Sequence, residues 1–172
     1  MLFRSTILYA NPDHEYRSIR MNQAHPRGLK PSWHGDSVGH YEGDTLVIDT
    51  IGVKTDRPYA MMDLFGTPYT AKLHIVERYR LRDYSEVKDA IERNRNENWL
   101  FNGDVWTGKQ SRKFLQVHVT IEDEGVFTSP WTATMTYAPS DDAFPESVCA
   151  ENPNEYYNNK LTDLPIAAKP DF

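Results

Sequence analysis

The sequence has little of what marks disulfide-rich, membrane-spanning or nucleic-acid-binding proteins. Cys149 is its only cysteine, which excludes an internal disulfide and a cysteine-rich zinc site. No apolar run approaches the ~20 residues that a membrane helix needs. Acidic residues outnumber basic ones, 25 to 19, and the formal net charge is −6. Because nucleic acid is bound by a basic face, the sequence predicts neither a nucleic-acid nor a membrane partner.

Short catalytic and metal-binding motifs are also missing. The histidines are His14, His25, His34, His40, His74 and His118. None of them forms an H-x-H pair or an H-E-x-x-H helix, so no metal and no other cofactor is expected. The chain has no G-x-S-x-G and no glycine-rich phosphate loop, and Cys149 has no catalytic partner near it in the sequence. Nucleophilic hydrolysis is therefore unsupported.

The length of 172 residues fits a single domain over positions 1–172. The first residues, "MLFRSTILYANPD", lack the apolar stretch and the cleavage site of a signal peptide. As written, the chain is expected in the cytoplasm; a trimmed form would be periplasmic or secreted. The sequence leaves the oligomeric state open, a homodimer included.

What the sequence does contain is a series of short β-branched and aromatic runs between turn signals, which is typical of strands. The expected strands are Ser5–Tyr9, Tyr16–Met21, Val38–Glu42, Thr45–Ile51, Leu73–Leu81, Phe114–Glu122, Trp131–Ala138 and a short Glu146–Ala150. Such a set, sequential and mostly antiparallel, predicts a mainly β fold. Because closure removes exposed strand edges, the favoured architecture is a lipocalin-like barrel of about eight antiparallel strands. A β-sandwich or jelly roll is the alternative.

Gly43 and Asp44 lie between two of these strands and predict a two-residue type II′ turn, because glycine supplies the positive φ of its first position. This turn fixes the register, with Glu42 opposite Thr45 and Val38 opposite Asp49. By alternation, one face then carries Val38, His40, Val47, Asp49 and Ile51.

Residues 84–112 interrupt the β pattern. Asp83 and Glu86 match a capping box, and apolar residues recur at helical spacing, which predicts a short helix over 84–94. The apolar stretch after it, with Trp99 and Trp106, is interpreted as a lid over a pocket mouth or as core packing.

Four segments together, "PSWHGDSVGHYEGDTLVIDTIGV", "LHIVERYRL", "VTIEDEGVFTSPWTATMTY" and "VCAENP", resemble a widespread group of uncharacterised bacterial proteins. The pattern of that group runs SxGxxEGDTLVVDT, LHVVERF, VTIDDPxxYTKPWT and CxEN. The matching positions are Gly39, Glu42, Gly43, Asp44, Asp49, His74, Glu77, Arg78 and Trp131. The group commonly carries a secretion signal that this chain lacks, and residues 84–112 replace a tight turn in its pattern. The resemblance implies no particular activity.

The candidate catalytic residues are two acids and two histidines. His40 and Asp49 lie diagonally on one predicted face, where a carboxylate can orient an imidazole for acid–base work. Glu77 lies in an apolar stripe, where a carboxylate is costly unless it is paired or catalytic. Strand alternation puts His74 and Arg78 on one face of their predicted strand and Glu77 on the other, and His74 is, with His40, a candidate acid partner. The alternative for each is structural: a solvated polar pair or a turn-capping Asp for His40 and Asp49, an ion pair with an arginine of an adjacent strand for Glu77, and an ordinary barrel histidine for His74.

The candidate substrate-binding residues are aromatic or basic: Trp33, Tyr41, Arg78, Trp99, Trp106, Trp131 and Tyr137. They suit an apolar or aromatic molecule that bears oxygen. The leading hypothesis is a small-molecule-binding barrel that acts as a cofactor-independent lyase, dehydratase or isomerase, with Asp49 or Glu77 as base. The alternatives are a non-catalytic module for a carbohydrate or hydrophobic ligand and a structural protein with a filled barrel. A buried acid beside a histidine favours the enzyme, and a flat row of exposed aromatics favours the binding module.

Overall fold

The computed structural model of the chain describes residues 4–9, 15–56, 60–62, 65–96 and 112–139, without the side chains of Asn94 and Arg95. In this part the fold is mainly β, as predicted. Its elements are β1 (Arg4–Leu8), β2 (Tyr16–Met21), β3 (Asp36–Glu42), β4 (Thr45–Ile51), β5 (His74–Arg82), α1 (Tyr84–Asn96), β6 (Phe114–Glu122) and β7 (Trp131–Tyr137). The strand predicted at Glu146–Ala150 lies outside the described residues.

The strands form one sheet in the order β1-β2-β3-β4-β5-β6-β7. All neighbours are antiparallel except β2 and β3, which are parallel and pair over only three positions, Ile19–Ser37 to Met21–Gly39. The sheet is mixed and is not closed into a barrel, so the lipocalin-like antiparallel barrel is not confirmed. The physical reason is the 22–35 connection, which crosses over to start β3 parallel to β2 where a hairpin would have kept the meander antiparallel.

The β3–β4 hairpin confirms its sequence prediction. Glu42 pairs with Thr45 and Val38 with Asp49. Gly43 has φ 62° and Asp44 keeps a negative φ, as a type II′ turn requires. Local turn chemistry therefore sets which side chains of β3 and β4 share a face.

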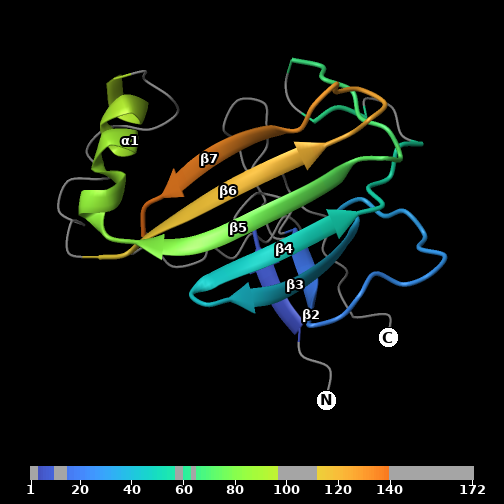
Figure 1. The fold of residues 1–172 in the computed structure, drawn as a ribbon, viewed down its shortest axis with the longest axis horizontal. Coiled ribbons are helices and arrows are strands. Elements are labelled where there is room, and N and C mark those ends of the chain that lie inside the picture. The colour runs from blue at the N-terminus through green and yellow to red at the C-terminus, as the bar shows by residue number, and fades with distance from the viewer. Residues whose placement is uncertain (1–3, 10–14, 57–59, 63–64, 97–111, 140–172) are drawn as a thin grey trace, which may run out of the picture.

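Helix α1 begins as the sequence predicts and ends two residues later. The backbone N–H of Asp83 donates to Glu86 Oε2 at 2.9 Å, which is one half of a capping box. Val87 and Ile91 are buried against Phe114 at the start of β6, so the apolar stripe of the helix covers one end of the sheet (Figure 1). Residues 97–111, with the predicted lid and its tryptophans, lie outside the described part.

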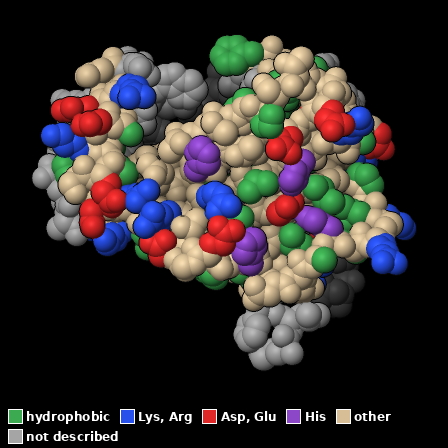
Figure 2. All heavy atoms as spheres, viewed as in Figure 1, with side chains coloured by type: hydrophobic (Ala, Val, Ile, Leu, Met, Phe, Trp, Pro, Cys, Tyr) green, Lys and Arg blue, Asp and Glu red, His purple; other side chains and the backbone are tan. Residues whose placement is uncertain are grey.

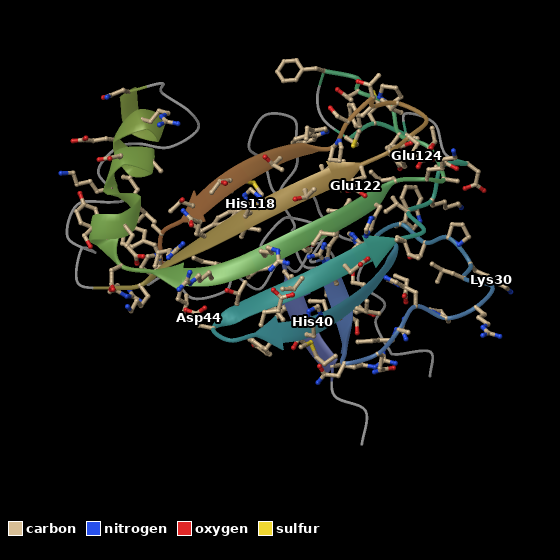
Figure 3. All side chains as sticks on the ribbon, in the orientation of Figure 1. Lys30, His40, Asp44, His118, Glu122 and Glu124 are labelled. Atoms are coloured by element: carbon tan, nitrogen blue, oxygen red, sulfur yellow. The ribbon has the colours of Figure 1, made fainter. Side chains whose placement is uncertain are left out.

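One face of the sheet is packed against other side chains, and the other face is exposed. The covered face carries Ile48, Val117 and Ile121. Tyr69 and Leu73, from the loop before β5, pack on this face. The other face, called the open face below, carries exposed His40 and His118. It is turned to the viewer in Figure 2 and in Figure 3, which labels both histidines. Strand alternation thus separates an apolar interior from a polar surface.

The sheet curls at β2, and Gly39 of β3 permits it. β1 and β2 turn behind β3 and β4 (Figure 1), so that Ile19 and Met21 pack with Ile48 on the covered face. A Cβ built on Gly39 would lie 2.8 Å from Ile19 Cγ2 and 3.1 Å from Met21 Sδ. β2 therefore occupies the space that a side chain at position 39 would fill.

No helix among the described residues is long and apolar enough to cross a membrane.

Replacing Gly39 by alanine should lower the free energy of unfolding by about 1–3 kcal/mol, because the new methyl group overpacks against buried Ile19. The measurement is urea unfolding at neutral pH. Gly43→Ala is the control: its Cβ would meet nothing within 4 Å, but its φ of 62° is unfavourable for alanine, so it isolates backbone strain from crowding. A Gly39→Ala variant as stable as wild type would mean that β2 does not depend on this close approach.

Candidate functional site

An aspartate held between two histidines lies on the open face, at the end of the sheet where β4 finishes. Oδ1 of Asp49 is 3.1 Å from Nε2 of His25 and 3.1 Å from Nε2 of His74. The three side chains are 37%, 20% and 34% exposed. Figure 2 shows histidines and acidic side chains gathered on this face around apolar ones. Substrate and solvent can reach such a half-exposed group, while its neighbours hold its geometry.

Each of these imidazoles meets a second carboxylate through its other nitrogen. Nδ1 of His25 is 2.6 Å from Asp36 Oδ2, and Nδ1 of His74 is 3.3 Å from Glu122 Oε2. At the far end, Arg20 donates to both oxygens of Asp36. The result is a continuous imidazole–carboxylate chain: Arg20, Asp36, His25, Asp49, His74 and Glu122. An imidazole can donate through both nitrogens only when doubly protonated, so the chain couples the protonation of its members.

Sheet register brings most of this chain together. Ile51 pairs with His74, and His74 pairs with Glu122. His74 of β5 and Glu122 of β6 therefore lie directly side by side. Asp49 is two residues before Ile51 on β4 and therefore on the same face, diagonal to His74. His25 comes instead from the 22–35 connection, where Arg20 also donates to the carbonyl of Ala24.

The charge of Asp36 is stabilised by its partners. Partial burial by itself would raise the pKa of Asp36, but hydrogen bonds from Arg20 and His25 hold that pKa below its ordinary value. Asp36 therefore remains an anion wherever the protein is folded near neutral pH, and it fixes the orientation of the His25 ring.

Apolar side chains flank the chain on the same face. Asp49 pairs with Val38 on one side and with Val76 on the other, and Val38 and Val47 are buried. Together with Ile51, these valines form an apolar floor from which the carboxylate and imidazoles rise. The arrangement can support an apolar molecule that turns an oxygen toward His74.

Two histidines that share one carboxylate raise the question of a metal site. Among residues 4–9, 15–56, 60–62, 65–96 and 112–139, however, no three or more histidine, cysteine, aspartate or glutamate side chains are arranged to hold a metal ion.

The predicted His40–Asp49 pair is not formed. His40 Nε2 lies 3.1 Å from Glu42 Oε1, and Arg78 donates to Glu42 Oε2 at 2.6 Å. The Arg78 hydrogen bond, first, and then that from His40 lower the pKa of Glu42. The histidines that contact Asp49 Oδ1 are His25 and His74, of which the sequence predicted His74 as a site residue, and His40 belongs to an exposed surface network.

Glu77 and Asp49 do not share one lumen, which corrects that part of the sequence interpretation. Glu77 pairs with Ile48 and Asp49 with Val76, and adjacent residues of a strand point to opposite faces. Glu77 is buried on the covered face, where it meets Arg17 of β2 at 2.7 Å. No histidine of the imidazole–carboxylate chain can therefore act together with Glu77.

The predicted aromatic residues do not converge. Trp33 and Tyr41 are exposed, and Lys54 Nζ lies 5.7 Å above the Trp33 ring. Trp131 makes an edge contact with Phe127 at 6.3 Å, and Tyr137 contacts Met135. Trp131 and Tyr137 both belong to β7, whereas Trp33 lies in the 22–35 connection and Tyr41 on β3, four strands away in the sheet order, so the four do not form one flat row. Trp99 and Trp106 lie outside the described residues.

Sequence reasoning missed His25 and Arg17. His25 is in an irregular proline-containing connection, where no periodicity indicates the direction of a side chain. Arg17 could have been found: it alternates with buried Ile19 and Met21 on β2, the same signal that singled out Glu77. Two opposite charges in apolar stripes of one sheet are expected to pair.

No protein-family profile, curated protein or solved structure matches the chain. The likeness to a bacterial group therefore stays a prediction, and functional inference depends on the geometry described above.

The lowered pKa of Asp36 predicts a specific pH dependence of stability. A carboxyl whose pKa is lowered by folding stabilises the protein above its unfolded pKa, ~3.9 for aspartate, and this contribution is lost as the pH falls through the lower folded pKa. In urea unfolding from pH 7 to pH 3, Asp36→Asn should be less stable than wild type by about 1–3 kcal/mol at neutral pH. The difference should shrink below about pH 4.

Asp56→Asn is the control, because Asp56 is 76% exposed and 3.5 Å from Lys54. It should follow the wild-type curve throughout. A difference between Asp36→Asn and wild type that stays constant down to pH 3 would show that the Asp36 charge is not what its partners stabilise.

Proposed function

We propose that the protein binds an apolar or aromatic small molecule bearing oxygen and acts on it, without a cofactor, by acid–base chemistry of the lyase, dehydratase or isomerase kind. The observation that carries this proposal is the shared oxygen of Asp49, which lies 3.1 Å from both His25 and His74 above an apolar floor. A carboxylate in contact with an imidazole orients the ring and selects its tautomer, as a general acid or base requires.

His74 is the proposed proton-transferring group. Its Nε2 is held by Asp49, and its Nδ1 faces Glu122, whose side chain is 49% exposed and 3.3 Å away. Because that contact is long and open to solvent, a substrate oxygen can take the place of Glu122 at Nδ1. A proton then moves between substrate and His74, while Asp49 stabilises the imidazolium that forms.

His25 is proposed as a positioning residue. Both of its nitrogens meet carboxylates, and it is the more buried of the two histidines on Asp49. It connects Asp49 to the Asp36–Arg20 pair and so holds the carboxylate that orients His74.

The apolar floor supports the substrate class. Val38 and Val47 are already buried, so the partly exposed Ile51 and Val76 are the floor side chains that an aliphatic or aromatic body would cover, a gain of about 25 cal/mol per Å² of apolar surface removed from water. A strongly charged molecule would gain nothing from these side chains. A carbonyl or hydroxyl oxygen on the apolar body would be the group that reaches His74.

The second candidate is a non-catalytic module for a carbohydrate or hydrophobic ligand. It is favoured by the exposed apolar side chains of β7, where Trp131, Met135 and Tyr137 occur at every second or fourth position. Side chains spaced in this way share one face of a strand. Binding without turnover is the outcome that would support this candidate.

Asp49→Asn and His74→Gln should each lower turnover of a substrate found by screening phenolic and hydroxylated compounds. The expected loss is about 100-fold or more, the usual contribution of a general acid or base. Asp49→Asn should also shift the pH profile of the remaining kcat/KM, because the amide no longer stabilises the His74 imidazolium.

His118→Gln is the matched control. His118 lies on the same face and contacts Thr134 at 3.0 Å, outside the imidazole–carboxylate chain, and its replacement should leave both rate and pH profile unchanged. Folding of each variant is checked by circular dichroism. Equal turnover by wild type and folded His74→Gln would contradict the proposal, and ligand binding without turnover of any screened compound would favour the binding module.

A further inference from the structure

The last strand of the sheet, β7, forms one of its two borders (Figure 1). It pairs with β6 on one side, and no strand of the described part of the chain pairs with its outer side. The outer row of backbone N–H and C=O groups on such an edge is a template on which another strand can add. Native sheets usually block an edge with a charged side chain, a proline, a bulge or a very short strand.

β7 has none of these protective features. Its sequence, WTATMTY, contains no charged residue and no proline. It pairs with β6 without a bulge, from Leu115–Tyr137 to Ile121–Trp131. It is seven residues long, whereas β1 at the opposite border has five residues and begins with Arg4. Of the two borders of the sheet, β7 is therefore the one suited to accept a further strand.

The side chains of β7 alternate between apolar and hydroxyl groups. Because Trp131 pairs with Ile121 and Met135 with Val117, the apolar side chains continue the covered face beyond β6. Three of them are exposed by 39%, 42% and 50%: Trp131, Met135 and Tyr137. The open face carries the hydroxyl groups of Thr132, Thr134 and Thr136. A strand that added to β7 would need the same division between its two faces.

The sequence of β7 is complementary to an antiparallel copy of itself. When Thr134 lies opposite its own copy, residues at equal distances from position 134 lie opposite each other. The resulting pairs are Trp131–Tyr137, Thr132–Thr136 and Ala133–Met135. Aromatic side chains then meet each other, as do threonines, which are the cross-strand pairs that stabilise antiparallel sheets. The pairing brings no charges together, although each chain carries a net charge of −6.

We propose that two copies of the chain associate through β7 into a symmetric dimer, in which the two seven-stranded sheets become one continuous sheet. About six to eight backbone hydrogen bonds would join the copies, because every second residue pair of an antiparallel ladder exchanges two. The two-fold axis at Thr134 is perpendicular to the sheet, so both open faces lie on the same side of the dimer. Neither Asp49 nor His74 is in the interface, and the proposal is independent of the proposed acid–base function.

The first test is sedimentation velocity of the full chain from ~1 to ~300 µM, since a single strand pair makes a small interface with an affinity in the micromolar range. A thiol reductant is present so that Cys149 cannot link two copies. The chain should change from monomer to dimer over this range. Hydrogen exchange at the two extremes should show slower exchange of the outer β7 amides at the higher concentration.

A charge at the centre of β7 then locates the interface. Thr134 is exposed and contacts His118 on the open face. Thr134→Lys places two like charges opposite each other only in the dimer, and should weaken association at least about 10-fold. Thr6→Lys is the matched control, because Thr6 is the exposed central residue of β1 at the other border. It should associate as the wild type does, and circular dichroism checks that both variants fold.

A mixture of two variants tests the register. Thr134→Glu alone should weaken association as Thr134→Lys does. Mixing the two should restore a dimer, because only the proposed two-fold axis puts position 134 opposite itself and so pairs the lysine with the glutamate.

Three outcomes would overturn the proposal. The first is a monomer at every concentration; if its outer β7 amides are nevertheless protected, another segment of the same chain covers the edge. The second is a dimer that Thr6→Lys dissociates and Thr134→Lys does not, which places the interface at β1. The third is a mixture of folded Thr134→Lys and Thr134→Glu that stays monomeric. The concentration dependence of hydrogen exchange in the wild type remains decisive if a variant does not fold.

Discussion

The close approach of β2 to Gly39 is the constraint on which the rest of the structure depends. Ile19 and Met21 occupy the space that a side chain at position 39 would fill, so β2 can cross the covered face rather than extend the sheet in its own plane. That crossing buries Ile19 on Ile48 and carries Arg17 to Glu77, three strands away in the sheet order. Without the curl, Glu77 would be an unpaired carboxylate in an apolar stripe, which is costly.

Strand alternation then gives the two faces of the sheet different chemistry. Ile48 and Asp49 are neighbours in sequence, as are Val76 and Glu77, and the register pairs Ile48 with Glu77 and Asp49 with Val76. One carboxylate is thereby sent to each face. On the open face Asp49 meets imidazoles, and on the covered face Glu77 meets a guanidinium and a phenol. A shift of β5 by one residue against β4 would move Glu77 to the open face, where Asp49 already lies, so the β4–β5 register is what separates the two carboxylates.

Features that depend on residues close together in the sequence could be predicted, and features that depend on residues far apart could not. The β3–β4 register and the start of α1 were predictable because Gly43, Asp44 and the Asp83–Glu86 cap act over a few residues. The face of Glu77 was also predictable, since alternation is local. The failure of the barrel to close, the arrival of His25 at Asp49 and the meeting of Arg17 with Glu77 depend on the path of the 22–35 connection and on the curl of β2. Those are properties of the assembled sheet, and no short pattern encodes them.

The two carboxylates have partners of different chemical kinds. Imidazole is the side chain whose charge ordinarily changes between pH 5 and 8, whereas a guanidinium is not deprotonated in proteins. Asp49 has imidazole partners, His25 and His74, on which the proposed acid–base function depends. The Arg17–Glu77 cluster has no such partner, because its cation is permanent and the pKa of Tyr79 is raised by burial and by Glu77. Its charges are fixed, and the 2.7 Å ion pair holds β2 against β5 on the covered face.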